Sequence, residues 1–306
     1  MITRVIVYTM LFSSCASYLT TLDYGNIASS IAEKAMGTVS RAAKDFNPVD
    51  ILLMRDTKSQ PKEGEGGFDL PETASLEDCK EHFPQGQVFP IEKVSKWKKP
   101  VALCQKGFAT IYSTELRMPL MTVERLSAQK LASGKGLKRY EFFYGDPRLN
   151  KADRVETTDL NRSGYGRGHL APAGNQADAD AMRQSFVMTN IIPQVPENNQ
   201  GAWAKIEDDV RKYVSRAKGD VFVYTITSTR TDKRRVLPKS DITVPDMLTK
   251  VVYDQGRNRA WVYELENTKE ARIKAPLSYA EALKVRKGLA VLPVAPESLA
   301  GGISGP

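Results

Sequence analysis

The chain has 306 residues, and its 44 Lys and Arg against 36 Asp and Glu give a formal charge of 44 − 36 = +8 with His neutral. A charged fraction of 26% and a hydrophobic fraction of 41% exclude an intrinsically disordered chain and a polytopic membrane protein. Three Cys exclude a zinc ribbon, and two His leave little room for a multi-histidine metal site. The positive charge favours an anionic partner, which is either a nucleic acid or a membrane surface.

The first 16 residues have the pattern of a minimal secretory signal segment. Met1–Arg4 carries one positive charge, Val5–Phe12 is apolar, and Ser13–Ser17 consists of small residues. We therefore expect export to a secreted or periplasmic location, with an apolar N-terminus on a cytoplasmic protein as the alternative. Cleavage after Ala16 competes with lipid attachment to a membrane at Cys15, because the residues before Cys15 resemble a degraded lipoprotein box.

Cys79 and Cys104 form the only cysteine pair in the body of the chain. An even pair in an oxidising compartment suggests one disulfide bond. Two unrelated small core residues fit the spacing equally well.

The sequence divides into four segments. Apolar residues at four-residue spacing predict a helix over Asn26–Lys44, and the Gly, Pro, Lys and Glu of Thr57–Ser75 indicate a linker. We expect a signal segment at 1–16, a helical segment and linker at 17–75, a main domain at 76–293 and a flexible tail at 294–306.

Short β-like runs dominate the main domain and are mixed with isolated helical patterns, which predicts an α+β fold. The expected strands are Val101–Leu103, Ala109–Tyr112, Met118–Val123, Glu141–Tyr144, Asp220–Thr227, Lys250–Tyr253 and Ala260–Leu265. The expected helices are Ala202–Ala217 and Tyr279–Val285.

The block Gly164–Asn175 combines a Gly-rich backbone, a cation and one of the two His. Arg167 and His169 are two residues apart, so on an extended strand they project from the same face, and Gly168 between them would let a substrate backbone approach closely. A neutral imidazole can take a proton from water while Arg stabilises phosphate charge, which suits phosphodiester hydrolysis. The alternative is a buried His satisfied by a carbonyl group.

The next segment, Met188–Arg211, is rich in Asn and Gln and ends in a helical pattern that opens near Gly201. Asn199, Glu207 and Arg211 fall at multiples of four residues on one flank of its apolar stripe. The amide oxygen is a hard ligand that is adequate for Mg²⁺, which keeps most of its waters. The alternative for the carboxylate and the guanidinium is a solvated i,i+4 ion pair. The apolar stripe consists of Trp203, Ile206, Val210, Tyr213 and Val214.

Three motifs in this region resemble those of the DNA/RNA non-specific endonucleases of the His-Me finger (ββα-metal) superfamily. The family pattern D-R-G-H-x-A-P stands here as Gly166–Pro172, [ST]-N-I-x-P-Q as Thr189–Gln194, and N-x-G-x-W-x-x-x-E-x-x-x-R as Asn199–Arg211. The resemblance covers roughly Cys79–Leu292. It implies a mixed or antiparallel central sheet flanked by helices, with a ββα-metal finger as the active site.

The resemblance also implies catalytic roles for matching positions. His169 would be the general base that activates water, and Asn190 would orient His169 or the site around it. Arg167 and Arg211 would bind the nucleic acid and neutralise charge on the reacting phosphate, for which guanidinium forks are suited.

A metal site follows from the same resemblance. Asn199 would be the one direct protein ligand of a single catalytic Mg²⁺, or of Mn²⁺ or another divalent cation. Glu207 would hold water beside the metal, and such partners fix the geometry of a metal site.

The implied substrates are double-stranded and single-stranded DNA and RNA, cut to 5′-phosphate and 3′-hydroxyl ends, with no protein partner. Cutting without sequence preference fits binding through phosphates. Candidate basic positions along the track are Lys96, Lys98, Lys99, Arg117, Arg125, Arg139, Arg230, Arg234 and Arg235.

One departure from the family pattern is Gly166, where the family normally has Asp. If that Asp tunes the neighbouring Arg or His, its loss weakens catalysis. The alternative function is therefore a catalytically impaired homologue that binds nucleic acid electrostatically without cutting it. An envelope-anchored structural protein is a third alternative, and it leaves the constellation around His169 unexplained.

Overall fold

The computed structural model describes Leu70 and residues 75–230 and 234–300. The expected signal segment and the helix over Asn26–Lys44 lie outside these residues, as does most of the linker. The described residues all belong to one compact unit that begins at Ser59. No helix within the described part of the chain is long and apolar enough to cross a membrane.

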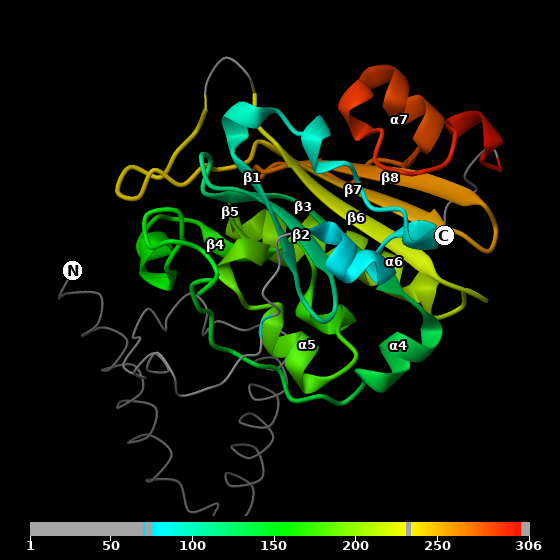
Figure 1. Cartoon of the computed structure of the whole chain (residues 1–306), viewed down its shortest axis with the longest axis horizontal. Coiled ribbons are helices and arrows are strands. Elements are labelled where there is room, and N and C mark those ends of the chain that lie inside the picture. The colour runs from blue at the N-terminus through cyan, green and yellow to red at the C-terminus, as the bar shows by residue number, and fades with distance from the viewer. Residues whose placement is uncertain (1–69, 71–74, 231–233, 301–306) are drawn as a thin grey trace, which may run out of the picture. The chain divides into compact units, whose positions relative to one another are not determined.

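The centre of the fold is a seven-stranded antiparallel sheet with the order β1-β2-β3-β6-β7-β8-β9 (Figure 1). Its strands are β1 (Pro100–Cys104), β2 (Ala109–Ser113), β3 (Met118–Leu126), β6 (Val221–Ser228), β7 (Met247–Asp254), β8 (Arg259–Glu266) and β9 (Leu277–Ser278). The α+β fold class predicted from the sequence is confirmed, and the sheet is wholly antiparallel. The central strands are buried along nearly their whole length, because both faces of the sheet are covered.

A second sheet consists of two short antiparallel strands, β4 (Gly166–His169) and β5 (Ile191–Gln194). His169 is paired with Ile191, and Gly166 is paired with Gln194. The extended conformation expected for the segment around Arg167 is therefore present, although the β5 segment was not among the expected strands.

Four α-helices within the described residues complete the framework. They are α4 (Ala128–Ser133), α5 (Ala179–Gln184), α6 (Ala204–Val214) and α7 (Tyr279–Val285). A π-helical segment, Asn198–Trp203, leads directly into α6. The described 3₁₀ helices are Leu76–His82, Pro84–Gly86, Ile91–Lys93, Lys96–Lys98, Thr157–Leu160, Ala173–Asn175, Met188–Asn190, Lys287–Leu289 and Pro296–Ser298.

Side-chain caps explain where three of these α-helices begin. Ser127 accepts a hydrogen bond from the Lys130 backbone N–H, and Asp178 accepts two from the first turn of α5. Ser278 and Glu281 form a reciprocal capping box at the start of α7, the helix whose predicted bounds are confirmed.

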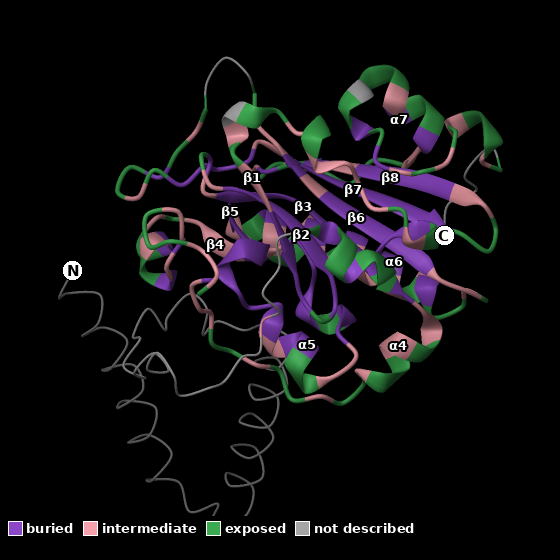
Figure 2. Ribbon diagram, in the orientation of Figure 1, coloured by how far each residue is buried: buried purple, intermediate pink, exposed green. Residues whose placement is uncertain are grey.

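Helix α6 covers one face of the large sheet, whose strands are mostly buried (Figure 2). Of the apolar stripe predicted here, Trp203, Ile206, Val210 and Val214 are buried and Tyr213 is half-buried. The opposite face, which carries Tyr224, is covered in part by Phe83 after the first 3₁₀ helix, with ring centroids 6.5 Å apart.

Three local expectations differ from the structure. Glu141–Tyr144 is not a strand and forms only one isolated bridge, between Tyr144 and Val187, because the Phe143 ring packs against Phe186 instead. Helices α4 and α5 were not expected, since each spans only six residues. The helical region that includes α6 begins earlier than Gly201, with the π-helical segment.

The first residues of the expected tail make defined contacts. Pro296–Ser298 is a 3₁₀ helix, and the Ala300 N–H donates to the carbonyl oxygen of Asn258 at 2.8 Å.

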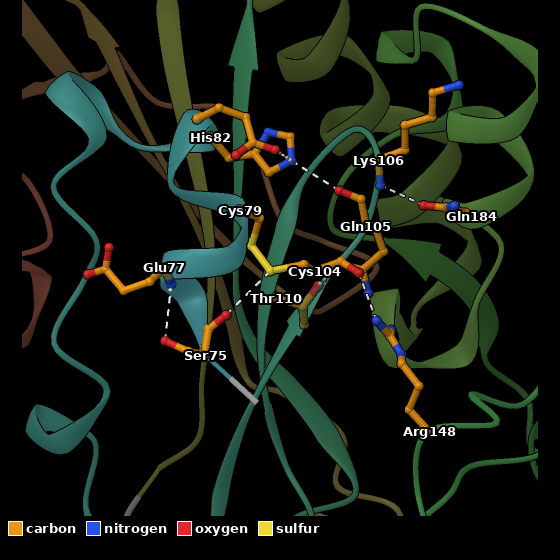
Figure 3. The surroundings of a disulfide bond; sticks show 11 residues. Ser75, Glu77, Cys79, His82, Cys104, Gln105, Lys106, Thr110, Arg148 and Gln184 are labelled. Atoms are coloured by element: carbon orange, nitrogen blue, oxygen red, sulfur yellow. Dashed lines mark hydrogen bonds and ion pairs between the residues drawn. A yellow bond between two sulfur atoms is a disulfide. The ribbon is translucent and has the colours of Figure 1, made fainter. Parts of the chain in front are cut away.

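A disulfide bond joins Cys79 to Cys104, and their Cα atoms are 5.7 Å apart (Figure 3). It attaches the 3₁₀ helix Leu76–His82 to the end of β1, where the imidazole of His82 also contacts the carbonyl oxygen of Gln105 at 3.0 Å. The expected cysteine pairing is therefore present, and it fixes the first described segment to the sheet.

Reduction of this bond is expected to lower the free energy of unfolding by about 3 kcal/mol, because the two cysteines are 25 residues apart and the bond restricts the unfolded chain. Urea unfolding of the oxidised and reduced protein measures the difference. Cys15→Ser is the control, since Cys15 takes no part in the bond, and it should leave the unfolding curve unchanged. Mass measurement that finds Cys79 and Cys104 as alkylatable thiols would refute the link.

Candidate active site

His169 lies at the end of β4 between two aromatic rings. Its ring centroid is 4.9 Å from that of Phe186 and 5.5 Å from that of Phe143. Burial, with a smaller contribution from the charge of Arg139, lowers the pKa of His169 to about 3. The enclosed Nε2 atom has no hydrogen-bond partner among the described residues. The imidazole is therefore held neutral, and the alternative of a His satisfied by a carbonyl group is not observed at this atom.

Arg167 projects from the same face of β4 as His169, as predicted from their spacing. Its guanidinium carbon lies 5.3 Å from the centroid of Phe143, the ring that also contacts His169. Its Nη2 donates to the carbonyl oxygen of Thr157 and to Oδ1 of Asn161, both at 2.8 Å. The orientation of this cation is thus fixed by the protein itself.

The glycines of β4 have different surroundings. A Cβ on Gly168 would overlap the side chain of Gln194 and lie 2.7 Å from its Cβ atom. The expectation that Gly168 admits a substrate backbone is therefore wrong, because the space is filled by Gln194 from β5. A Cβ on Gly166 would instead meet the Gln194 carbonyl oxygen at 3.6 Å and the Asn199 Nδ2 at 3.7 Å, which are ordinary contacts.

Asn190 is completely buried, and its amide is used inside the protein. Oδ1 accepts from the Ala171 N–H at 2.9 Å, while Nδ2 donates to the carbonyl oxygens of Ala171 at 2.9 Å and Ser185 at 2.7 Å. The side chain thus fastens the chain two residues after His169 to the end of α5. It contacts the backbone beyond His169 rather than the imidazole.

Asn199 has the opposite environment, although it follows another buried Asn. Asn198 is buried, accepts a hydrogen bond from Gln194 Nε2 at 2.7 Å and donates to the Glu266 carbonyl oxygen at 2.7 Å. The partly exposed amide of Asn199 has no hydrogen-bond partner among the described residues and faces Gly166 at the start of β4. Both residues lie in the π-helical segment, a distortion that is frequent at functional sites.

Arg211 reaches the end of the block that follows β4. Its Nη1 donates to Oδ1 of Asn175 at 3.5 Å, and a Cβ on Gly174 would lie 3.7 Å from the same nitrogen. Its ion-pair partner is Asp208, at 4.0 Å, rather than Glu207. The predicted alternative of a solvated Glu207–Arg211 pair is therefore not observed.

Burial raises the pKa of Glu207, and the charges of Lys250 and Arg211 oppose this shift. Asn199, Asn190 and Arg211 all contact the segment Gly166–Asn175, whereas Glu207 forms no hydrogen bond or ion pair with this segment among the described residues. Apart from Glu207, the expected site residues therefore converge on this ten-residue segment, which includes Arg167 and His169.

Two ionisable groups below α6 were not expected from the sequence. Glu124 is completely buried in β3, and Nδ2 of Asn175 lies 3.2 Å from each of its carboxylate oxygens. Burial raises the pKa of Glu124 to about 7. Lys250 in β7 donates to Oγ1 of Thr225 at 2.6 Å, and its Nζ lies 4.9 Å from the Trp203 ring centroid. The sequence signal that could have identified both groups was a charged residue inside an otherwise apolar stretch with strand character.

The side-chain amide of Asn199, which has no hydrogen-bond partner among the described residues, can offer its oxygen to a divalent metal. The described residues contain no group of three or more His, Cys, Asp or Glu side chains that could enclose a metal ion. A hard cation bound here would therefore use the Asn199 amide oxygen, waters and substrate phosphate, which is a coordination that Mg²⁺ accepts.

Several cations expected along a nucleic-acid track are used within the protein. Lys99, Arg117, Arg125, Arg234 and Arg235 form ion pairs with Glu115, Asp159, Asp220, Asp241 and Asp246, respectively. Arg139 is different, because its guanidinium carbon lies 5.1 Å from the centroid of Phe186 beside His169.

Comparisons with known proteins agree with this geometry. The family model of the DNA/RNA non-specific endonucleases matches residues 86–290. The human mitochondrial nuclease EXOG is 32% identical over 161 residues, which cover 49% of this chain and 43% of EXOG. Human mitochondrial endonuclease G is 32% identical over 158 residues, which cover 48% of this chain and 52% of that protein. The chain thus spans about half the length of the curated relatives it matches.

A crystal structure described as the EndoG/EndoGI complex, with the mechanism of EndoG inhibition, aligns with a TM-score of 0.52 and 24% identity. The alignment covers 60% of this chain and 82% of that one, and it shows a shared fold. The strands β4 and β5 followed by α6 form the ββα unit of the metal-dependent nuclease fold. The chain belongs to the DNA/RNA non-specific endonuclease family.

The expectation of export is wrong on these comparisons, because the relatives from human, mouse and fission yeast are named as mitochondrial nucleases. The expectation depended on one positive charge and a short apolar run that includes Tyr8 and Thr9. These features are too general to define the cellular location of a protein. Lipid attachment at Cys15 depended on the same export.

The two glycines of β4 provide a matched pair of substitutions. Gly168→Ala is expected to lower the free energy of unfolding by about 1–3 kcal/mol, because the added methyl group overlaps buried Gln194. Gly166→Ala should change it by less than about 1 kcal/mol, since its methyl group meets only ordinary contacts. Denaturant unfolding of both variants measures the difference, and equal effects would contradict the packing argument.

Neither imidazole is expected to titrate near pH 6.5, because burial lowers the pKa of His82 to about 4 and that of His169 to about 3. The unfolded chain gains these protons near pH 6.5, so the stability they contribute is complete above that pH. It is lost progressively as the pH falls from 6.5 to about 4 for His82 and to about 3 for His169. NMR titration of the imidazole protons, assigned with His169→Gln, measures both groups. A native signal that titrates between pH 6 and 7 contradicts the expectation.

Proposed function

We propose that the chain is a divalent-metal-dependent endonuclease that hydrolyses phosphodiester bonds in DNA and RNA. The observation that carries the proposal is the convergence on Gly166–Asn175 of a neutral imidazole, an amide with no hydrogen-bond partner among the described residues and a guanidinium. We further propose that the nuclease domain spans residues 76–293, joined through residues 17–75 to the N-terminal segment and followed by a tail at 294–306.

His169 acts as the general base in this proposal. A neutral imidazole accepts the proton of a water molecule, whose oxygen attacks phosphorus while the bond to the 3′ oxygen breaks. The products are a 5′-phosphate and a 3′-hydroxyl end. The imidazole is neutral at neutral pH, which is the protonation state that a general base needs.

The two arginines bind and neutralise the reacting phosphate. Hydrogen bonds that orient both guanidinium groups support this role. Arg167 donates to the Thr157 carbonyl oxygen, and Arg211 donates to Asn175 Oδ1. Asn190 is a positioning residue, since its buried amide fastens the backbone that follows His169.

Asn199 would hold the metal, with Mg²⁺ as the proposed ion. The bound cation supplies Lewis-acid stabilisation of the charge that develops on the phosphate oxygens. Glu207 supports the site from α6, where it would orient water through its carboxylate. The family is divalent-metal dependent, which supports a metal without selecting the ion.

The purified chain is expected to degrade plasmid DNA, single-stranded DNA and RNA with Mg²⁺, and chelation should abolish the activity. His169→Ala should lower kcat by at least about 100-fold, because it removes the general base. Asn199→Ala should also abolish Mg²⁺-dependent cutting, since it removes the proposed ligand.

Gln200→Ala is the matched control for Asn199→Ala, because Gln200 is the exposed neighbour in the same π-helical segment. It should retain full activity. Intact substrate with wild-type protein and Mg²⁺, together with salt-sensitive gel retardation, would contradict the enzyme and support the binding-only alternative. If Gly166→Asp then restored cutting, the missing Asp would be identified as the cause of the lost activity.

A further inference from the structure

A row of aromatic rings leads from the protein surface to His169. The ring centroids of Phe142 and Tyr140 are 5.6 Å apart, those of Tyr140 and Phe186 are 5.5 Å apart, and those of Phe186 and His169 are 4.9 Å apart. Each of these contacts is edge-to-face. The outer ring, Phe142, is therefore braced by its neighbours and connected to the proposed catalytic imidazole through a continuous packed series.

The side chain of Phe142 is exposed on the protein surface. It is 39% exposed and is the one aromatic residue among the large hydrophobic residues that are exposed in the described chain. The other three, Val236, Ile273 and Val285, lie elsewhere in the sequence and are aliphatic. An exposed ring that is connected through two packed rings to the proposed catalytic imidazole is a surface on which another flat apolar group can stack.

Positive charge accompanies the row. Lys138 and Arg139 directly precede Tyr140, both are exposed, and neither forms an ion pair with a described acidic residue. The Arg139 guanidinium lies over Phe186 at 5.1 Å, and the Arg167 guanidinium lies over Phe143 at 5.3 Å. Glu141 is the one acidic residue within Lys138–Tyr144. Cations interleaved with aromatic rings match the alternation of phosphate and base along a nucleic-acid strand.

We propose that Phe142, braced by Tyr140, is a stacking platform for an unpaired nucleobase next to the scissile phosphate. The platform favours single-stranded nucleic acid, because the faces of bases inside a duplex are already covered by their neighbours. It rests on the proposed nuclease function and names the substrate class that the site prefers. Phe142 does not touch the reacting atoms and acts on specificity through substrate binding.

The test compares kcat/KM on single-stranded and duplex oligonucleotides of the same sequence. Phe142→Ala is expected to lower kcat/KM about 10-fold on the single strand, mainly through a higher KM, because stacking contributes equally to the ground and transition states. The change on the duplex should stay below about twofold. Phe142→Trp should retain the preference and Phe142→Leu should lose it, since only the indole restores an aromatic face.

An abasic scan locates the partner of the ring. Removing one base at a time on either side of the cut should find a position at which the wild type also loses about 10-fold and Phe142→Ala loses nothing more. Val285→Ala is the control, because Val285 is a 76% exposed apolar residue on α7, and it should leave both substrates unaffected. Equal losses on single strand and duplex, no loss on either, or an effect of Phe142→Ala that persists at every abasic position would overturn the platform.

A binding measurement under conditions that prevent cleavage tests the stacking platform independently of the proposed nuclease activity. Fluorescence anisotropy of a labelled single-stranded oligonucleotide, measured with full-length protein and chelator, should show weaker binding for Phe142→Ala than for the wild type. If the wild type cuts no substrate with Mg²⁺ but shows this difference, the nuclease function fails and the platform stands. If cutting is robust and the difference is absent, the platform fails and the nuclease function stands.

Discussion

The burial of two ionisable side chains in the central sheet constrains the geometry above it. Glu124 and Lys250 lie on the face that α6 covers, because the pairs Glu124–Val223 and Thr225–Lys250 share one side of the antiparallel register. Burying a carboxylate or an ammonium costs several kcal/mol unless polar partners replace the lost water. The partners here include Asn175 for Glu124, and Thr225 and the Trp203 ring for Lys250. The polar interior of the sheet is thus satisfied by residues of the same segments that carry the site.

This dependence links core and site through short chains of contacts. Asn175 accepts from Arg211 on one side and donates to Glu124 on the other, so the position of the Arg211 guanidinium is tied to β3. A similar chain runs from the disulfide. Arg148 donates to the Cys104 carbonyl oxygen and pairs with buried Asp146, which accepts from the hydroxyl group of Thr189 beside Asn190. One series of contacts ends at Asn175, after β4, and the other ends at Thr189, beside Asn190. These neighbouring segments hold β4 in place, although the strand has only four residues.

The sequence allowed prediction of elements whose signal is local. The buried strands of the sheet and the apolar stripe of α6 follow from periodicity, and the order of the motifs located the block around His169. Tertiary context decided the rest. The aromatic run at Glu141–Tyr144 has strand propensity, yet Phe142 packs on Tyr140 and Phe143 packs on Phe186 rather than on a neighbouring strand. The space beside Gly168 is filled by Gln194, a residue 26 positions later, which no local pattern contains. Asn190 and Asn199 are the same residue type and differ in burial. The buried amide of Asn190 is used in internal hydrogen bonds, whereas the partly exposed amide of Asn199 remains available to bind a ligand.

Net charge is a poor guide to where a polyanion binds on this protein. The excess of +8 suggested a broad basic track, but many of the arginines serve the fold. Arg117 donates to the carbonyl oxygens of Ser240 and Arg154 and also pairs with Asp159, while Arg148 is enclosed around Asp146. Such groups contribute to the field at long range, where salt screens them, but they are not free to follow a phosphate backbone. Near His169, the guanidinium groups of Arg139 and Arg167 lie over the rings of Phe186 and Phe143, and these contacts orient them. Local arrangement, rather than the total charge, therefore determines which part of the surface can hold a nucleic-acid strand.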